Sequence, residues 1–126
     1  MLMTTKILLS AKIHRVTVTH CDLNYEGSCG IGPDLLKASG IMPCERVSVL
    51  NVSTGGRLET YVIRGKKKGE VSLNGAAARH ATVGDKVIIV AYSLVPENEI
   101  AKHKARIVMV DGKNRVISRH TNSPLD

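Results

Sequence analysis

The stretch Val87-Ile88-Ile89-Val90-Ala91 is continuously apolar, and the turn-forming pair Gly84-Asp85 precedes it. Four of its five residues are β-branched, which favours extended backbone. A short apolar run that follows a turn is typical of a strand buried on both faces of a sheet. The segment therefore predicts a central strand over residues 86–94.

Several segments on either side of this run also have the pattern of strands. Residues 12–20 alternate, with Ile13, Val16 and Val18 among polar side chains, and a period of two is typical of a half-buried strand. Further strands are predicted over residues 45–52, 58–64, 70–73 and 105–110. Turn-forming residues recur roughly every ten positions, which favours a mainly β barrel or sandwich. The pattern alone does not choose between these two architectures.

Two short helices are also predicted. The first begins at Pro33-Asp34, because proline suits the first turn and a carboxylate is favourable at the positive end of the helix dipole; it ends at Gly40. The second covers residues 96–102. The polar tail, residues 118–126, is predicted to be frayed.

The chain has 126 residues, enough for a single domain, residues 1–126, with its own apolar core. Its formal charge of +7 is compatible with a partner that is a polyanion. The cations are scattered, however, and the chain has neither Phe nor Trp to stack on bases. The densest run, Lys66-Lys67-Lys68, fits a solvated loop better than a binding patch. A basic small β-barrel that binds nucleic acid without catalysis is therefore kept only as the alternative function.

The cysteines give no sign of a disulfide framework or a metal site. Cys21, Cys29 and Cys44 are odd in number and have no ligand-like spacing with the five histidines. Unpaired thiols fit a reducing cytoplasm. No apolar run has membrane-spanning length, and residues 1–6 lack the pattern of a signal peptide. We therefore expect a cytoplasmic protein that binds neither a membrane nor a metal.

The segment that points to a function is Asp22-Leu23-Asn24-Tyr25-Glu26-Gly27-Ser28-Cys29. Lys12-Ile13-His14-Arg15 lies upstream, and Arg57-Leu58-Glu59-Thr60-Tyr61 and Asn74-Gly75-Ala76-Ala77-Ala78 lie downstream. Together these blocks, within residues 12–95, resemble the pyruvoyl-dependent aspartate 1-decarboxylase family. The resemblance implies a mainly β fold, the six-stranded double-psi β-barrel with short helices. It also implies a homotetramer with sites at subunit interfaces.

The resemblance further implies that the chain cuts itself between Gly27 and Ser28. The cut would give a β chain of residues 1–27 and an α chain of residues 28–126, with Ser28 converted into a covalent pyruvoyl cofactor. Glycine suits the position before the serine, because its wider range of backbone angles could bring the hydroxyl oxygen to the preceding carbonyl. An ordinary turn is the alternative for this pair of residues taken alone.

A pyruvoyl group would act as an electron sink, forming a Schiff base with a substrate amine and accepting the electrons released with carbon dioxide. Such a site needs cations for the substrate carboxylates and a weak acid for the product carbanion. By resemblance, Lys12 and Arg57 bind substrate carboxylate, and the forked guanidinium of Arg57 suits this role. Tyr61 is the implied proton donor, because a phenol stays protonated at neutral pH.

The remaining site residues also follow from the resemblance. Thr60 is implied to contact the reacting carbonyl and to assist cleavage. Thr60 and Tyr61 point to opposite faces of an ideal strand, so both serve one site only if the strand bends or the site lies between subunits. The other implied residues are Gly75, Ala76 and Ala77 for substrate binding, and His14, Tyr25 and Asn74 as supporting side chains. A turn into a helical segment fits residues 74–79 almost as well as a ligand-binding backbone.

The leading hypothesis is therefore pyruvoyl-dependent decarboxylation of L-aspartate to β-alanine and carbon dioxide, for pantothenate and coenzyme A biosynthesis. A maturation factor that promotes cleavage could be a further partner. A related pyruvoyl enzyme that acts on another amino acid is a weaker alternative.

Overall fold

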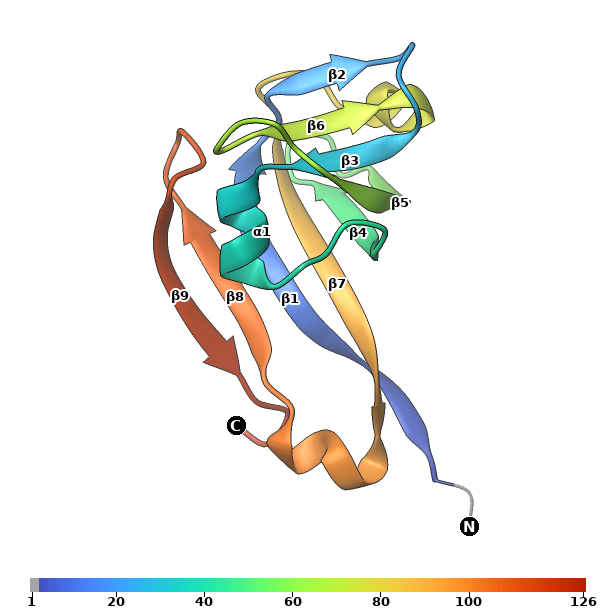
Figure 1. The fold of residues 1–126 in the computed structure, drawn as a ribbon, viewed down its shortest axis with the longest axis vertical. Helices are drawn as coiled ribbons and strands as arrows, with labels where there is room; N and C mark the ends of the chain where they lie inside the picture. Colours follow the sequence, from blue (N-terminus) through green and yellow to red (C-terminus); the bar gives the residue numbers. More distant parts are fainter. Residues whose placement is uncertain (1–2) are drawn as a thin grey trace.

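The computed structural model describes residues 3–126, and the chain is mainly β (Figure 1). Within these residues, nine strands are joined by turns and three short helices. The strands are β1 (Thr5–Thr17), β2 (His20–Asp22), β3 (Ser28–Ile31), β4 (Arg46–Asn51), β5 (Arg57–Arg64), β6 (Val71–Asn74), β7 (Lys86–Pro96), β8 (Ala105–Val110) and β9 (Val116–Asn122). The helices are α1 (Pro33–Ser39) and the 3₁₀-helices η1 (Gly75–His80) and η2 (Glu97–Lys102). The predicted mainly β fold with short helices is confirmed.

The strands pair in the order β2-β6-β3-β5-β4-β7-β1-β8-β9. The pairs β1–β8, β2–β6 and β3–β5 are parallel, and the other pairs are antiparallel. The short strands β2, β3 and β6 gather at one end of the molecule, while β1, β7, β8 and β9 run lengthwise (Figure 1). The six-stranded double-psi arrangement stays a prediction.

The predicted central strand is β7, which pairs with β1 on one side and β4 on the other. Val87, Ile89 and Ala91 are fully buried, and Val90 is nearly so. They join an apolar core made of aliphatic side chains, as a chain without Phe or Trp requires. Its largest fully buried members are Ile13, Ile31, Leu35, Leu73, Ile89, Val16, Val18, Val47, Val49, Val62, Val71 and Val87.

The strand predicted over residues 12–20 is divided in the structure. β1 extends further towards the N-terminus than predicted and ends at Thr17. After it, the Val18 N–H donates to the Asp85 carbonyl and the Thr19 N–H donates to the Val71 carbonyl. These bonds turn the chain towards β6, so His20 begins β2 beside that strand. The alternating pattern identified extended backbone but not the change of partner strand.

The helix predicted from Pro33 is confirmed. Proline occupies the first turn of α1, and Gly40 follows its last residue with a φ of 78°. The Gly40 N–H donates to the Leu36 carbonyl, which ends the helix in the way that favours glycine. The second predicted helix is present as the 3₁₀-helix η2.

The prediction of a frayed tail over residues 118–126 is wrong for most of that segment. β9 pairs antiparallel with β8, from Ala105 opposite Asn122 to Val110 opposite Val116. Nearly all β9 side chains are exposed. A strand ordered by backbone pairing rather than by burial does not show the alternation of apolar residues that predicts strands.

No helix in residues 3–126 is long and apolar enough to cross a membrane. The expectation that the chain start lacks a signal peptide rests in part on Met1 and Leu2, which lie outside the described residues.

Candidate active site

Ser28, the predicted cleavage residue, is the first residue of β3 and is fully buried. β3 lies between β5 and β6. In the antiparallel register with β6, Ser28 is directly opposite Asn74. The turn in this segment falls earlier, at Leu23 and Asn24. Ser28 is therefore part of the sheet, and the turn in this segment lies before it.

The Ser28 hydroxyl has two hydrogen-bond partners. The Asn74 amide Nδ2 donates to Ser28 Oγ at 3.1 Å. Ser28 Oγ in turn donates to the Glu26 carbonyl at 3.1 Å. Asn74 is itself buried, so this pair is shielded from bulk water and the oxygen is fixed in one position.

Gly75, not Gly27, is the glycine with a backbone angle that other residues rarely adopt. Gly75 has a φ of 62°, and a Cβ placed there would come within 2.7 Å of the Gly27 backbone. Gly27 lies outside the left-handed region, and a Cβ on it would meet the Asn74 carbonyl only at 3.9 Å. The prediction that Gly27 needs wide backbone freedom concerns the cleavage step and stays a prediction. Its close neighbour Gly75 needs to be glycine in the structure itself.

Three of the predicted residues share one face of the sheet. Lys12 of β1 pairs with Val90, Val90 pairs with Ser48, and Ser48 pairs with Glu59 of β5. Directly paired residues point to the same face, and Arg57 and Tyr61 lie two positions either side of Glu59. Lys12, Arg57 and Tyr61 are therefore on this face, which is the outer one. Lys12 and the β5 residues are separated by two intervening strands, β7 and β4.

Thr60 points to the opposite face of β5, as strand geometry predicts. It pairs with the buried Val47 and is half-buried, whereas Tyr61 is 42% exposed. β5 runs parallel to β3 with Val62 opposite Cys29. This register directs Thr60 towards the Gly27 end of β3 and leaves Tyr61 on the outer face. Within one chain, β5 does not bend enough to bring both side chains to one face.

His14 lies where β1 is irregular. The β1–β7 register shifts between Ile13 and Val16, and Arg15 has a φ of 56°. Among residues 3–126, His14 Nδ1 is the buried side-chain polar atom without a hydrogen-bond partner. Burial, and then the charges of Lys12 and Arg15, hold the pKa of His14 below its ordinary value. Both effects favour the neutral form of the imidazole.

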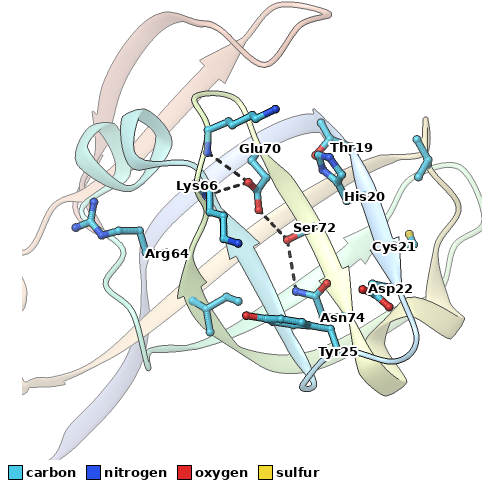
Figure 2. A pocket seen from close by; sticks show the side chains of 13 residues that line it. Thr19, His20, Cys21, Asp22, Tyr25, Arg64, Lys66, Glu70, Ser72 and Asn74 are labelled. Carbon is cyan, nitrogen blue, oxygen red and sulfur yellow. Dashed lines mark hydrogen bonds between the residues drawn. The ribbon is translucent and has the colours of Figure 1, made fainter.

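A cavity of about 600 Å³ lies beside Asn74. Tyr25 and Asn74 both line it, together with cationic side chains of Arg64, Lys66 and Lys67 (Figure 2). Two of the predicted supporting residues are thus brought together. Lys12, Arg57 and Tyr61 are not among its lining residues, so the predicted site is not gathered in one cavity of a single chain.

The small-residue segment after β6 is helical. Gly75, Ala76 and Ala77 belong to η1, where Gly75 and Ala77 are buried and Ala76 is exposed. The alternative of a turn into a helical segment is therefore correct for its backbone. The direct contact of these residues with substrate stays a prediction.

Two residues next to this site were not singled out from the sequence. Ser72 donates to a Glu70 carboxylate oxygen at 3.2 Å and accepts from Asn74 Nδ2 at 3.5 Å (Figure 2). The available signal was the alternation Glu70-Val71-Ser72-Leu73-Asn74, which in an extended segment puts three polar side chains on one face.

Cys29, beside Ser28, is not a candidate nucleophile. It is fully buried, and burial raises the pKa of its thiol to about 12. Within residues 3–126, no group of three or more His, Cys, Asp or Glu side chains is placed to hold a metal ion.

Within one chain, the structure thus shows a buried serine held by a carboxamide, and an outer face of the sheet that carries Lys12, Arg57 and Tyr61. The class of protein that comparison with known proteins indicates is a carboxy-lyase. A family model described as "Aspartate decarboxylase" matches residues 3–117. The chain belongs to the aspartate decarboxylase family.

Individual relatives agree with this assignment. An aspartate 1-decarboxylase of Ruminiclostridium cellulolyticum is 57% identical over 116 residues, covering 91% of this chain and 90% of the relative. The aspartate 1-decarboxylase of Bordetella avium is 54% identical over 112 residues, covering 88% and 92%. That of Bdellovibrio bacteriovorus is 54% identical over 112 residues, covering 89% and 90%.

Proposed function

We propose that this protein decarboxylates L-aspartate to β-alanine and carbon dioxide, using a pyruvoyl group made from its own Ser28. The observation that carries the proposal is the buried hydrogen bond between Asn74 and Ser28, the residue that follows Gly27. It occurs in a member of the aspartate decarboxylase family. β-Alanine made in this way would serve pantothenate biosynthesis. The unpaired thiols of Cys21, Cys29 and Cys44 fit a cytoplasmic location.

The surroundings of Ser28 are compatible with its conversion into a pyruvoyl group. The self-cleavage would begin with attack of Ser28 Oγ on the Gly27 carbonyl carbon. The O–C bond forms as the C–N bond breaks, and the hydroxyl proton ends on the freed nitrogen. Elimination then takes the Ser28 α-proton and releases residues 1–27 with a terminal carboxylate. Addition of water and loss of ammonia complete the conversion and leave residues 28–126 as the larger chain.

A pyruvoyl group supplies a ketone that captures a substrate amine and accepts the electron pair freed as carbon dioxide departs. The chain's own residues would bind and orient the substrate. Arg57 offers two parallel N–H donors to one carboxylate, and Lys12 offers a point charge to another. Tyr61 would return a proton to the reacting carbon, because its phenol carries one at neutral pH. Thr60 and Asn74 would position the backbone at Gly27–Ser28, where β3 begins.

The proposal includes assembly of several copies, with each site completed at an interface. Lys12 lies across two strands from Arg57 in one chain, and Thr60 and Tyr61 face opposite ways. The paired strands β1 and β7 also expose Ile7 and its partner Leu94, at 70% and 73%. Such apolar exposure is typical of an interface. A homotetramer is the state we propose, with a maturation factor as an optional partner.

The direct test incubates the purified protein with L-aspartate and measures β-alanine and carbon dioxide. Equimolar β-alanine and carbon dioxide from the wild-type protein, and neither from Ser28→Ala, is the expected result. Competition with other amino acids then identifies the substrate, since a related enzyme for another amino acid would prefer the competitor. A wild-type protein that is cleaved yet leaves L-aspartate unchanged would contradict the proposed substrate. Light scattering of the same sample measures the assembly.

A further inference from the structure

A continuous chain of hydrogen bonds runs from the surface loop after β5 to Ser28. We call Glu70, Ser72, Asn74 and Ser28 the polar chain; Figure 2 shows its first three members. Ser72 Oγ donates to Glu70 Oε2 at 3.2 Å, and Asn74 Nδ2 donates to Ser72 Oγ at 3.5 Å. Asn74 Nδ2 also donates to Ser28 Oγ at 3.1 Å. Ser72, Asn74 and Ser28 are buried.

The Glu70 carboxylate is held in place by the loop that follows β5. Its Oε1 accepts the backbone N–H of Lys66 at 2.9 Å and that of Lys67 at 3.4 Å. A Cβ on Gly65 would come within 3.1 Å of the Glu70 carboxyl carbon. The loop backbone therefore packs closely around the carboxylate and leaves Oε2 directed at Ser72.

Gly30 makes room for the middle of the polar chain. Gly30 pairs directly with Ser72 across β3 and β6. A Cβ on Gly30 would overlap Ser72 Oγ and would come within 3.2 Å of Glu70 Oε2. The space that this glycine leaves is thus occupied by the hydroxyl and carboxylate that meet there.

The donor and acceptor of every hydrogen bond in the polar chain follow from Glu70, its first member. An ionised carboxylate only accepts hydrogen bonds, so Ser72 must give its single proton to Glu70. Ser72 Oγ can then only accept from Asn74, which requires the NH₂ end of the carboxamide to face it. The same NH₂ group lies against Ser28 Oγ, which therefore accepts and gives its own proton to the Glu26 carbonyl.

We propose that Glu70 is a positioning residue for self-cleavage: acting through Ser72, it fixes which end of the Asn74 carboxamide faces Ser28. The inference rests on the proposed function, because it concerns the attack of Ser28 Oγ on the Gly27 carbonyl carbon. Asn74 with its NH₂ group towards Ser28 donates to the attacking oxygen and holds it in one position. A reversed carboxamide would offer an acceptor instead and would remove that donor.

The test measures the rate at which freshly purified precursor is cleaved, by intact mass under denaturing conditions. Glu70→Gln keeps the side-chain shape but can turn a donor towards Ser72, so cleavage should slow by about tenfold or more. Ser72→Ala should slow it comparably, and the double variant should be no slower than Ser72→Ala alone. Glu70→Asp keeps the carboxylate and should cleave faster than Glu70→Gln. Glu99→Gln, on the exposed side of η2, is the matched control and should cleave at the wild-type rate.

Thermal unfolding of each precursor separates positioning from loss of fold. Folded Glu70→Gln and Ser72→Ala precursors that cleave at the wild-type rate would overturn the inference, as would fully additive slowing in the double variant. If Glu70→Gln does not fold, the cleavage rate of Ser72→Ala alone tests the inference, and a wild-type rate would overturn it. A wild-type chain that stays intact would instead remove the proposed cleavage itself, so the two failures are distinguishable.

Discussion

Ser28 and Asn74 lie directly opposite each other across β3 and β6, and the Asn74 amide donates to the Ser28 hydroxyl at 3.1 Å. Asn74→Asp keeps the shape of this partner but replaces the donor by a group that only accepts. We expect cleavage at Gly27–Ser28 to slow by about tenfold or more, because the attacking oxygen loses its hydrogen bond. The rate is measured by intact mass against Asn122→Asp, an exposed residue of β9. Equal rates for the two variants would show that the bond has no part in cleavage.

Gly75→Ala should destabilise the protein more than Gly55→Ala. Both glycines have positive φ, 62° and 82°, so each substitution costs about 1–2 kcal/mol in backbone strain. A Cβ at position 55 meets nothing within 4 Å, whereas at position 75 it presses on the Gly27 backbone. Overpacking of this kind adds about 1–3 kcal/mol. Chemical denaturation of both variants measures the difference, and equal losses would contradict the close approach.

Arg57→Lys should raise KM for L-aspartate by about tenfold, because the charge remains but the two-pronged contact with a carboxylate is lost. kcat should change less, since the residue binds the substrate and does not transfer the proton. Steady-state kinetics on fully cleaved protein measures both constants, with Arg119→Lys on β9 as the control. An unchanged KM would place the substrate carboxylate elsewhere.

His14 should make the protein less stable in mild acid. Its pKa in the folded protein is lowered by burial and by Lys12 and Arg15, so the unfolded chain binds the proton more readily. The stabilisation is complete above the unfolded value, about 6.5, and is lost as pH falls through the lowered value. His14→Gln cannot titrate and should show a smaller loss of unfolding free energy between about pH 7.5 and about pH 5.5. Equal losses of unfolding free energy in the two proteins would show that His14 is not the cause of the lower stability in acid.

The thiols of Cys44 and Cys29 should differ in reactivity. Cys44 is exposed, whereas Cys29 is fully buried and the pKa of its thiol is raised to about 12. Since the thiolate is the reactive form, folded protein treated with iodoacetamide should be modified at Cys44 and spared at Cys29. Peptide mass mapping locates the adducts, and treatment in denaturant gives the fully modified reference. Rapid labelling of Cys29 in folded protein would contradict its burial.

The pattern of apolar residues in the sequence predicted the strands whose side chains are buried. It did not predict an exposed strand or a change of partner strand, because neither depends on burial. The apolar run at 87–91 correctly identified β7. β9 is ordered by backbone bonds to β8 and is almost wholly exposed, so its sequence resembled a frayed tail. The turn of the chain after Thr17 depends on bonds to Asp85 and Val71, far away in sequence.

The candidate site was predictable as a set of residues but not as an arrangement. Period-two geometry correctly separated Thr60 from Tyr61, because it depends on one strand alone. The common face of Lys12 and Arg57 depends on the register of four strands, which local sequence does not determine. The close approach of Gly75 to the Gly27 backbone also depends on the pairing of β3 with β6, so nothing in the local sequence indicates that position 75 requires glycine.

The central claim is that the chain cuts itself before Ser28, and the intact mass of purified, denatured protein after warm incubation tests it most directly. We expect two chains, residues 1–27 and residues 28–126. The larger should be lighter by one ammonia than the same chain beginning with serine, and Ser28→Ala should stay whole. A wild-type protein that keeps the mass of one uncut chain of 126 residues would contradict the account.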